Sequence, residues 1–195
     1  MTKKQGAVRP RSGQNRTLKY RVLDWMTTVV IGVGAAALLL FGVFSPMRVE
    51  SATMSGVEKG DVVVADRLGK YLYGFDRGDM LLLKPVEFEI NKNTDKKAEP
   101  LRLARVVAFA GETVTISGGS VYINGSLLDE TEYARALYTS IRMEFTVPSG
   151  SVFVLPDERL YLTDEMLEEL VVDTNRIKGE VRFIAYPFAR MAAFK

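Results

Sequence analysis

The 23 residues from 25 to 47 include no Asp, Glu, Lys or Arg, and Asp24 and Arg48 flank them. As an α-helix this stretch would be roughly 35 Å long, enough to cross the apolar core of a bilayer. Residues 1–24 hold seven Lys or Arg residues and one acid, which predicts that the N-terminus is cytoplasmic. We therefore predict a basic cytoplasmic tail (1–24), a single transmembrane helix (25–47) in the cell membrane, and an extracellular domain (48–195).

Two alternative explanations of the apolar stretch fit it less well. A cleavable signal peptide has a shorter apolar region, of roughly 7–15 residues, followed by small residues at the cleavage site. The segment FSPMRVE at the end of this stretch is a poor cleavage site. A buried core helix rarely contains 18 or more consecutive uncharged residues. Residues 1–14 carry basic residues, Gly, Ser and Pro without an apolar period, and we expect them to be disordered.

The chain has no Cys and no His. Disulfides, Cys nucleophiles, zinc sites built on Cys or His, and Ser-His-Asp triads are therefore excluded. The sequence contains no acidic metal-loop pattern and no glycine-rich phosphate loop, so we predict neither a metal ion nor a cofactor. Beyond residue 24 the chain carries 19 basic and 23 acidic residues, and this net charge of −4 argues against nucleic acid as a partner.

Strand patterns dominate the sequence after residue 48. Asn124 and Gly125 predict a type I′ turn within a β-hairpin. Residues 163–172 are the one stretch with a helical pattern, and the polar residues 91–100 are predicted to be a solvated loop. Short strands at this spacing favour a mostly β domain, as an antiparallel barrel or folded sheet. The predicted strands are residues 61–66, 79–84, 103–110, 113–117, 121–123, 141–147, 152–155 and 181–186.

Five short motifs follow one another in this domain, and their order is more specific than any one of them. The series resembles the bacterial type I signal peptidases, the S26 family of membrane-bound serine endopeptidases that use a Ser/Lys dyad. The resemblance covers residues 49–188 and the preceding span, and it implies an antiparallel β-domain of the signal peptidase type behind the transmembrane helix. The motifs are Ser51-Ala52-Thr53-Met54, Gly78-Asp79, the segment 104–112, the hairpin of residues 121–128 and the segment 152–164.

The first family motif reads Ser-x-Ser-Met, and its second Ser is the nucleophile. Thr53 falls at this nucleophile position, while Ser51 matches the first Ser, which in the family helps to form the oxyanion hole. The resemblance implies that Ser51, Thr53 and Met54 contribute to a peptide-binding and oxyanion site. A Thr adds a methyl group that restricts χ1 and crowds the path of attack. In the alternative interpretation, Thr53 is an ordinary loop residue and Ser51 caps a turn.

The general base of the family is a Lys, and here Ala104 occupies its position, followed by Arg105. A hydroxyl nucleophile must lose a proton to a nearby base, and neither an alanine nor a permanently charged guanidinium can accept that proton. The loss of one member of a catalytic unit typically costs on the order of 10⁴–10⁶ in rate. Lys59 or Lys70 could replace the base only if the fold brings one of them to Thr53.

The last family motif reads Gly-Asp-Asn, followed by an Arg and by a Ser that orients the Lys. This chain has PDER at residues 156–159, so Glu158 replaces the Asn, and Leu162 replaces the Ser. Arg–carboxylate pairs commonly fix loops, so the charged residues in and near this motif are predicted to be structural. The predicted structural charge cluster comprises Arg105, Asp157, Arg159 and Asp164.

Changes at the nucleophile, at the base and at the residue that orients the base favour a fold retained for binding. The first hypothesis is a non-catalytic signal-peptidase-like chaperone or scaffold, of the kind found in pilus gene clusters of Gram-positive bacteria beside sortases. Its partners would be secreted or pilin precursor polypeptides, with sortase or the secretion machinery and membrane lipid as further contacts. The second hypothesis is a divergent signal peptidase that cleaves signal peptides with Thr53. The third is an adaptor that docks on a true signal peptidase.

Overall fold

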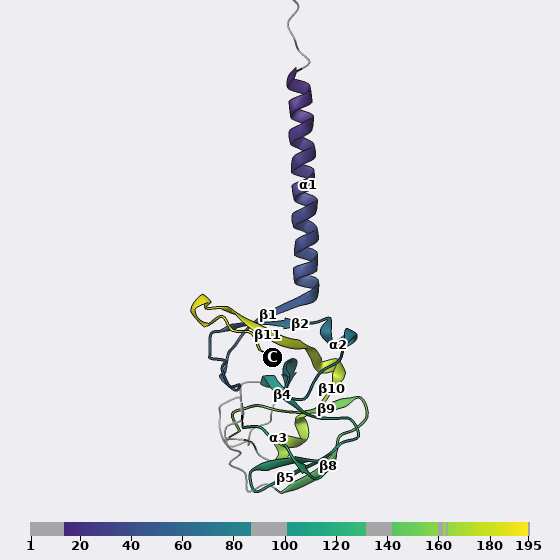
Figure 1. The fold of residues 1–195 in the computed structure, drawn as a ribbon, viewed down its shortest axis with the longest axis vertical. Coiled ribbons are helices and arrows are strands. Elements are labelled where there is room, and N and C mark those ends of the chain that lie inside the picture. The colour runs from purple at the N-terminus through teal and green to yellow at the C-terminus, as the bar shows by residue number, and fades with distance from the viewer. Residues whose placement is uncertain (1–13, 87–100, 132–141, 160–161, 163, 195) are drawn as a thin grey trace, which may run out of the picture. The chain divides into compact units, whose positions relative to one another are not determined.

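The computed structural model describes residues 14–86, 101–131, 142–159, 162 and 164–194. The chain divides into two compact units, Met1–Gly42 and Val43–Lys195, which are considered separately (Figure 1). The predicted loop at 91–100 and residues 1–13 of the segment 1–14, predicted to be disordered, lie outside the described residues; Gln14, the last residue of that segment, is helical.

The first unit contains the helix α1 (Gln14–Val43), of which Leu18–Val43 is long and apolar enough to cross a membrane. The predicted span of residues 25–47 is wrong at its C-terminal end, because the helix stops at Val43, while toward the N-terminus the helix continues beyond the predicted start. Residues 14–24 are helical as well, and Phe44–Arg48 form the strand β1. Pro46 has no backbone N–H to donate and disfavours helical geometry in the residue before it, so the helix ends ahead of this proline.

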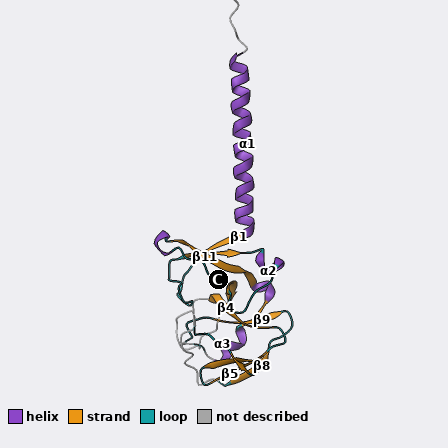
Figure 2. Cartoon of the chain, in the orientation of Figure 1, coloured by secondary structure: helices purple, strands orange, loops and turns teal. Residues whose placement is uncertain are grey.

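The second unit contains a seven-stranded antiparallel sheet, which Figure 2 shows in orange together with a smaller sheet. Its strands β3 and β4 lie in the interior of the sheet, with β1, β2 and β11 on one side and β9 and β10 on the other. In spatial order the strands are β1, β2 (Val62–Asp66), β11 (Ile177–Tyr186), β3 (Met80–Val86), β4 (Leu101–Phe109), β9 (Ser151–Leu155) and β10 (Val171–Asp173).

The smaller sheet has four antiparallel strands and lies at the far end of this unit from β1 and β2 (Figure 1). The Asn124-Gly125 turn predicted from the sequence is confirmed, since both residues have positive φ, 51° and 81°. In order the strands are β7 (Ser126–Leu127), β6 (Ser120–Ile123), β5 (Thr113–Ser117) and β8 (Met143–Thr146). The short helices of the unit are α2 (Gly69–Leu72), α3 (Asp164–Glu169), η1 (Thr174–Arg176) and η2 (Phe188–Arg190).

The predicted mostly β, antiparallel fold that follows an apolar N-terminal helix is confirmed, with a local correction to the predicted helix at 163–172. The helix predicted at 163–172 ends at Glu169, because Val171 and Val172 pair with Phe153 and Val152 of β9. Valines are stiff at χ1 and fit a strand better than a helix. Residue 141, the start of one predicted strand, is outside the described residues.

Two apolar cores lie on opposite faces of the strands β3 and β4. Leu81, Leu83 and Ala104 belong to the first core, whereas Met80, Leu82 and Leu103 belong to the second. Successive side chains of a strand point to opposite faces, so a strand that is buried on both faces carries an uninterrupted apolar run. The second core also receives three side chains from the segment that follows β1, namely Val49, Met54 and Val57. This segment carries Thr53 and is anchored by those three side chains.

Candidate functional site

A groove of about 550 Å³ lies beside Thr53. One wall is the segment 52–58, which the second core anchors, and the other comes from the segment 190–192 near the end of the chain. Asp157 and Glu158 complete the lining between them. Both Thr53 and Met54 line this groove, and Met54 is also buried in the core behind it. Ser51, predicted to share the site, is half-buried and is not among the lining residues.

Backbone hydrogen bonds hold Thr53 against the motif at 156–159. The Thr53 carbonyl oxygen accepts two hydrogen bonds of 3.0 Å, from the backbone N–H groups of Asp157 and Glu158. The Thr53 N–H donates to the carbonyl of Ser51 at 3.1 Å. Within the described part of the chain, the Thr53 hydroxyl makes no hydrogen bond, so no base is in place to take its proton.

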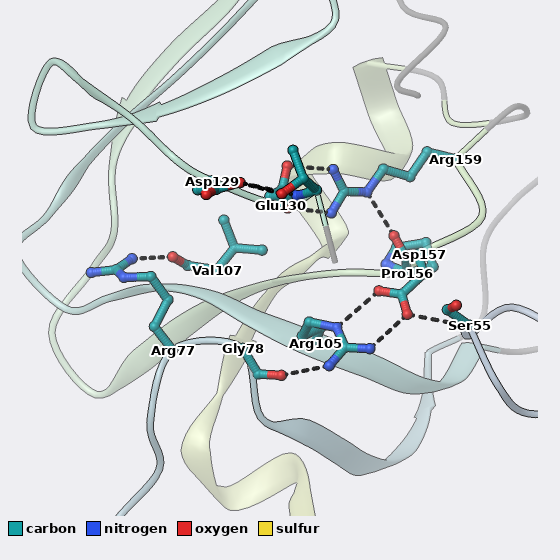
Figure 3. A network of polar contacts seen from close by, with 11 residues as sticks. Ser55, Arg77, Gly78, Arg105, Val107, Asp129, Glu130, Pro156, Asp157 and Arg159 are labelled. Carbon is teal, nitrogen blue, oxygen red and sulfur yellow. Dashed lines mark hydrogen bonds and ion pairs between the residues drawn. The ribbon is translucent and has the colours of Figure 1, made fainter. Parts of the chain in front are cut away.

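The Asp157 carboxylate joins three segments of the chain (Figure 3). Arg105 donates to it through Nε at 3.0 Å and through Nη2 at 2.7 Å, in a bidentate ion pair. The backbone N–H of Ser55 donates to the same carboxylate at 2.9 Å, and Arg105 also donates to the Gly78 carbonyl at 2.7 Å. Strand β4, the turn before β3 and the Thr53 segment are therefore tied to one buried charge pair.

Arg159 forms a second, separate pair, with Glu130 (Figure 3). Its two Nη atoms donate to the Glu130 carboxylate at 2.8 and 2.6 Å, and its Nε donates to the Pro156 carbonyl at 2.7 Å. Of the four residues predicted as one charge cluster, Arg105 and Asp157 pair with each other, whereas Arg159 pairs with Glu130, which lies outside the predicted set. Asp164 is the first residue of α3, and its side chain lies outside the described part of the structure. The sequence motif did not reveal Glu130, because it lies 29 residues from Arg159.

Ala104, at the position of the family's general base, is completely buried in strand β4 opposite Leu81 of β3. Its neighbours in the first core are apolar, and Leu162 packs against the same core. Of the two lysines considered as substitutes, Lys70 donates to the Ile177 carbonyl at 2.7 Å and lines a different hollow. Lys59 is exposed and does not line the groove.

The one cation among the described lining residues is Arg190, which sequence reasoning missed. It pairs with Glu58 on the facing wall and donates to Asp61 at 3.2 Å, and these acids raise the pKa of its guanidinium. A guanidinium stays protonated in proteins, so Arg190 cannot serve as a general base. Arg190 thus connects the segment 190–192 to the facing wall of the groove through its ion pair with Glu58. The partners lie 129 and 132 residues apart in the sequence, and no local pattern signals them.

Comparison with known proteins identifies the family of the chain. The family model described as "Signal peptidase, peptidase S26" matches residues 22–186. The chain belongs to the signal peptidase family. The resemblance inferred from the motif series is therefore confirmed, and the antiparallel fold agrees with it.

Similar proteins include several bacterial signal peptidases. Signal peptidase I of Bacillus amyloliquefaciens and signal peptidase I T of Bacillus subtilis (strain 168) are each 27% identical over 205 residues, covering 100% of both chains. The probable signal peptidase I-1 of Synechocystis is 28% identical over 163 residues, covering 83% of this chain and 81% of its own. A crystal structure of a signal peptidase I from Enterococcus faecalis V583 matches with 22% identity and a TM-score of 0.37, covering 54% of this chain and 95% of that one.

Proposed function

We propose that this signal peptidase family member binds precursor polypeptides without cleaving them, as a membrane-anchored chaperone or scaffold. The observation that supports this proposal is the alanine at the general-base position. Ala104 is fully buried among apolar side chains, and no lysine lines the groove in the described part of the chain. A Thr hydroxyl with no base beside it is a weak nucleophile.

The groove itself supports a binding role. Its volume of about 550 Å³ accommodates a short extended segment, and its walls are held by backbone hydrogen bonds and by the ion pair of Arg190 with Glu58. Such preorganisation lowers the cost of ordering a flexible polypeptide. We propose secreted or pilin precursors as clients. The β-domain would bind them outside the cytoplasm, while the basic N-terminal tail of the chain remains in the cytoplasm.

A second candidate function is slow cleavage by Thr53. One observation favours it, because Thr53 lines the groove and its hydroxyl is free of hydrogen bonds within the described residues. This alternative requires a base in contact with the Thr53 hydroxyl. Arg190 stays protonated, and among the described residues no carboxylate of the groove lining, Glu158 included, makes a hydrogen bond to that hydroxyl.

A cleavage and capture assay separates the two functions. The full chain in lipid nanodiscs is incubated with a panel of secretory and pilin precursors, and products are identified by mass spectrometry. We expect bound precursor and no cleavage. Cleavage that disappears in Thr53→Ala would establish the enzyme. A parallel incubation with a purified signal peptidase tests the adaptor, which would be favoured if the chain captures the peptidase and no precursor.

A restored dyad, Thr53→Ser with Ala104→Lys, tests whether the groove lacks only its chemistry. We expect this variant to gain cleavage of a precursor that the natural chain only binds. Ala104→Met is the matched control, because it adds comparable length to the buried position without an amine. Circular dichroism of both variants shows whether the larger side chain is accommodated.

A further inference from the structure

Glu158 differs from the other acids around the groove in that its carboxylate has no partner among the residues that the structure describes. The carboxylate of Asp157 is paired with Arg105, and those of Glu58 and Asp61 are paired with Arg190. The Glu158 side chain makes no hydrogen bond or ion pair with any described residue. The groove therefore presents one carboxylate that the described structure does not neutralise.

The main chain of Glu158 is fixed beside Thr53, because its N–H donates to the Thr53 carbonyl at 3.0 Å. The residue lines the groove and is half-buried. In this position a carboxylate is partly shielded from water and interacts more strongly with a nearby charge than a fully exposed one does. The motif that residues 156–159 resemble has a neutral amide at this position, so the extra charge belongs to this chain.

Formal charges point to the sign of the ligand. The charged lining residues Glu58, Asp157, Glu158 and Arg190 sum to −2, and the sum stays at −2 when their partners behind the lining, Arg105 and Asp61, are included. A bound segment with an acidic side chain would add like-charge repulsion, whereas a Lys or Arg side chain would reduce the net negative charge.

We infer that Glu158 selects precursors carrying a Lys or Arg next to the segment that lies against Thr53. The inference rests on the proposed function, since it specifies which polypeptides the same groove accepts. Glu158 acts as a specificity determinant through charge, while the walls of the groove receive the backbone of the client.

Binding of designed peptides tests this inference. The full chain in nanodiscs is titrated against fluorescent peptides that have an apolar segment followed by Ala-Gln-Ala. Within the set, one Lys is placed in turn at each of five flanking positions, with Gln and Glu versions of each peptide. We expect Lys to tighten binding about five- to tenfold over Gln at one or two positions, and Glu to weaken binding there. The preference should shrink above roughly 0.3 M salt, where exposed charges are screened.

Two variants decide whether Glu158 is responsible. Glu158→Gln should abolish the Lys preference, so that the Lys and Gln versions of each peptide bind this variant equally. Glu144→Gln, which removes the same charge from β8 outside the groove, should retain it. Equal binding of Lys and Gln peptides, or a preference that survives Glu158→Gln, would overturn the inference and leave the proposed function standing. If no peptide of any charge binds, the proposed function itself fails.

Discussion

At the scale of single residues, Asp157 is a buried carboxylate that connects several segments of the chain. Its carboxylate is almost completely buried and accepts hydrogen bonds from Arg105 and from the Ser55 N–H. Its own N–H holds the Thr53 carbonyl. Buried ion pairs add little net stability compared with apolar packing, but removing one partner leaves the other charge uncompensated.

We predict that Asp157→Asn lowers the free energy of unfolding by about 3–5 kcal/mol, because the variant breaks the buried bidentate pair between the Asp157 carboxylate and Arg105. Urea denaturation of the chain in detergent micelles measures this change. Glu50→Gln is the control: Glu50 is exposed and its contact with Arg102 is 3.8 Å long, so the cost should stay below about 1 kcal/mol. Equal costs for the two variants would contradict the structural role of the Asp157 pair.

Glu180 makes stability depend on pH. Burial is the main reason that the pKa of Glu180 is raised to about 7, Asp79 adds to the effect, and Arg182 at 2.8 Å opposes it. The folded state therefore binds more protons than the unfolded state, and stability falls as the pH rises from about 4.5 to 7. The shift corresponds to about 3 kcal/mol.

We predict that Glu180→Gln removes most of this slope. The stability of the variant relative to the natural chain should therefore increase as the pH rises from 5 to 8. Urea denaturation at a series of pH values tests this. Burial works against ionisation of Glu112 as well, but hydrogen bonds from Arg77 and the Phe109 N–H outweigh it and the pKa is lowered. Glu112→Gln should therefore leave the slope above pH 5 unchanged. A natural chain whose stability is flat between pH 5 and 7 would contradict the prediction.

At the scale of elements, β1 closes one edge of the large sheet. Its five residues pair with β2 from Phe44 opposite Asp66 to Arg48 opposite Val62. The next residue, Val49, is buried in the second core and exchanges backbone hydrogen bonds with the segment at 60–61. Strand β1 thus fixes the start of the segment that carries Thr53.

We predict that a fragment starting at Val43 unfolds cooperatively, whereas one starting at Glu50 melts about 6–12 °C lower. The shorter fragment loses the β1 pairing and the burial of Val49, together worth about 3 kcal/mol or more. Calorimetry of both fragments gives the comparison. Coincident melting curves would show that β1 contributes nothing to the fold.

Sequence patterns predicted the elements that carry their own signal. Alternation and turn residues located most strands of both sheets, and the Asn124-Gly125 hairpin followed from the positive φ that its turn requires. Strand β1 was missed because its residues continue an apolar stretch that is also typical of a membrane helix, with Pro46 as the one contrary signal. Strand β10 was missed because its valines extend the helical pattern of α3.

The candidate site was predictable only in part, for a different reason. Motif order located Thr53, Ala104 and the segment 156–159, and the comparison confirmed the family. The partners Glu130 and Arg190 are brought to the site by tertiary folding from distant parts of the chain. A sequence without an alignment contains no local signal for such pairs.

At the scale of the whole molecule, an apolar helix and a β-unit with a polar groove are combined in one short chain. Family membership and the proposed lack of cleavage are compatible. The strands, the turns and the Arg105–Asp157 pair build the groove, whereas the chemistry of the family depends on a single amine at the position of Ala104. One substitution at that position can therefore separate recognition from reaction while the fold persists.

The pair formed by Arg159 and Glu130 also constrains how this protein can diverge. The Arg159 side chain is completely buried and its partner is nearly so, with 11% of the side chain exposed. Neutralising either residue alone leaves a charge in the interior, so an ancestral line that changes one must pass through a weakened intermediate. Among descendants the two positions should be inherited as a unit, exchanged together for apolar residues or not at all.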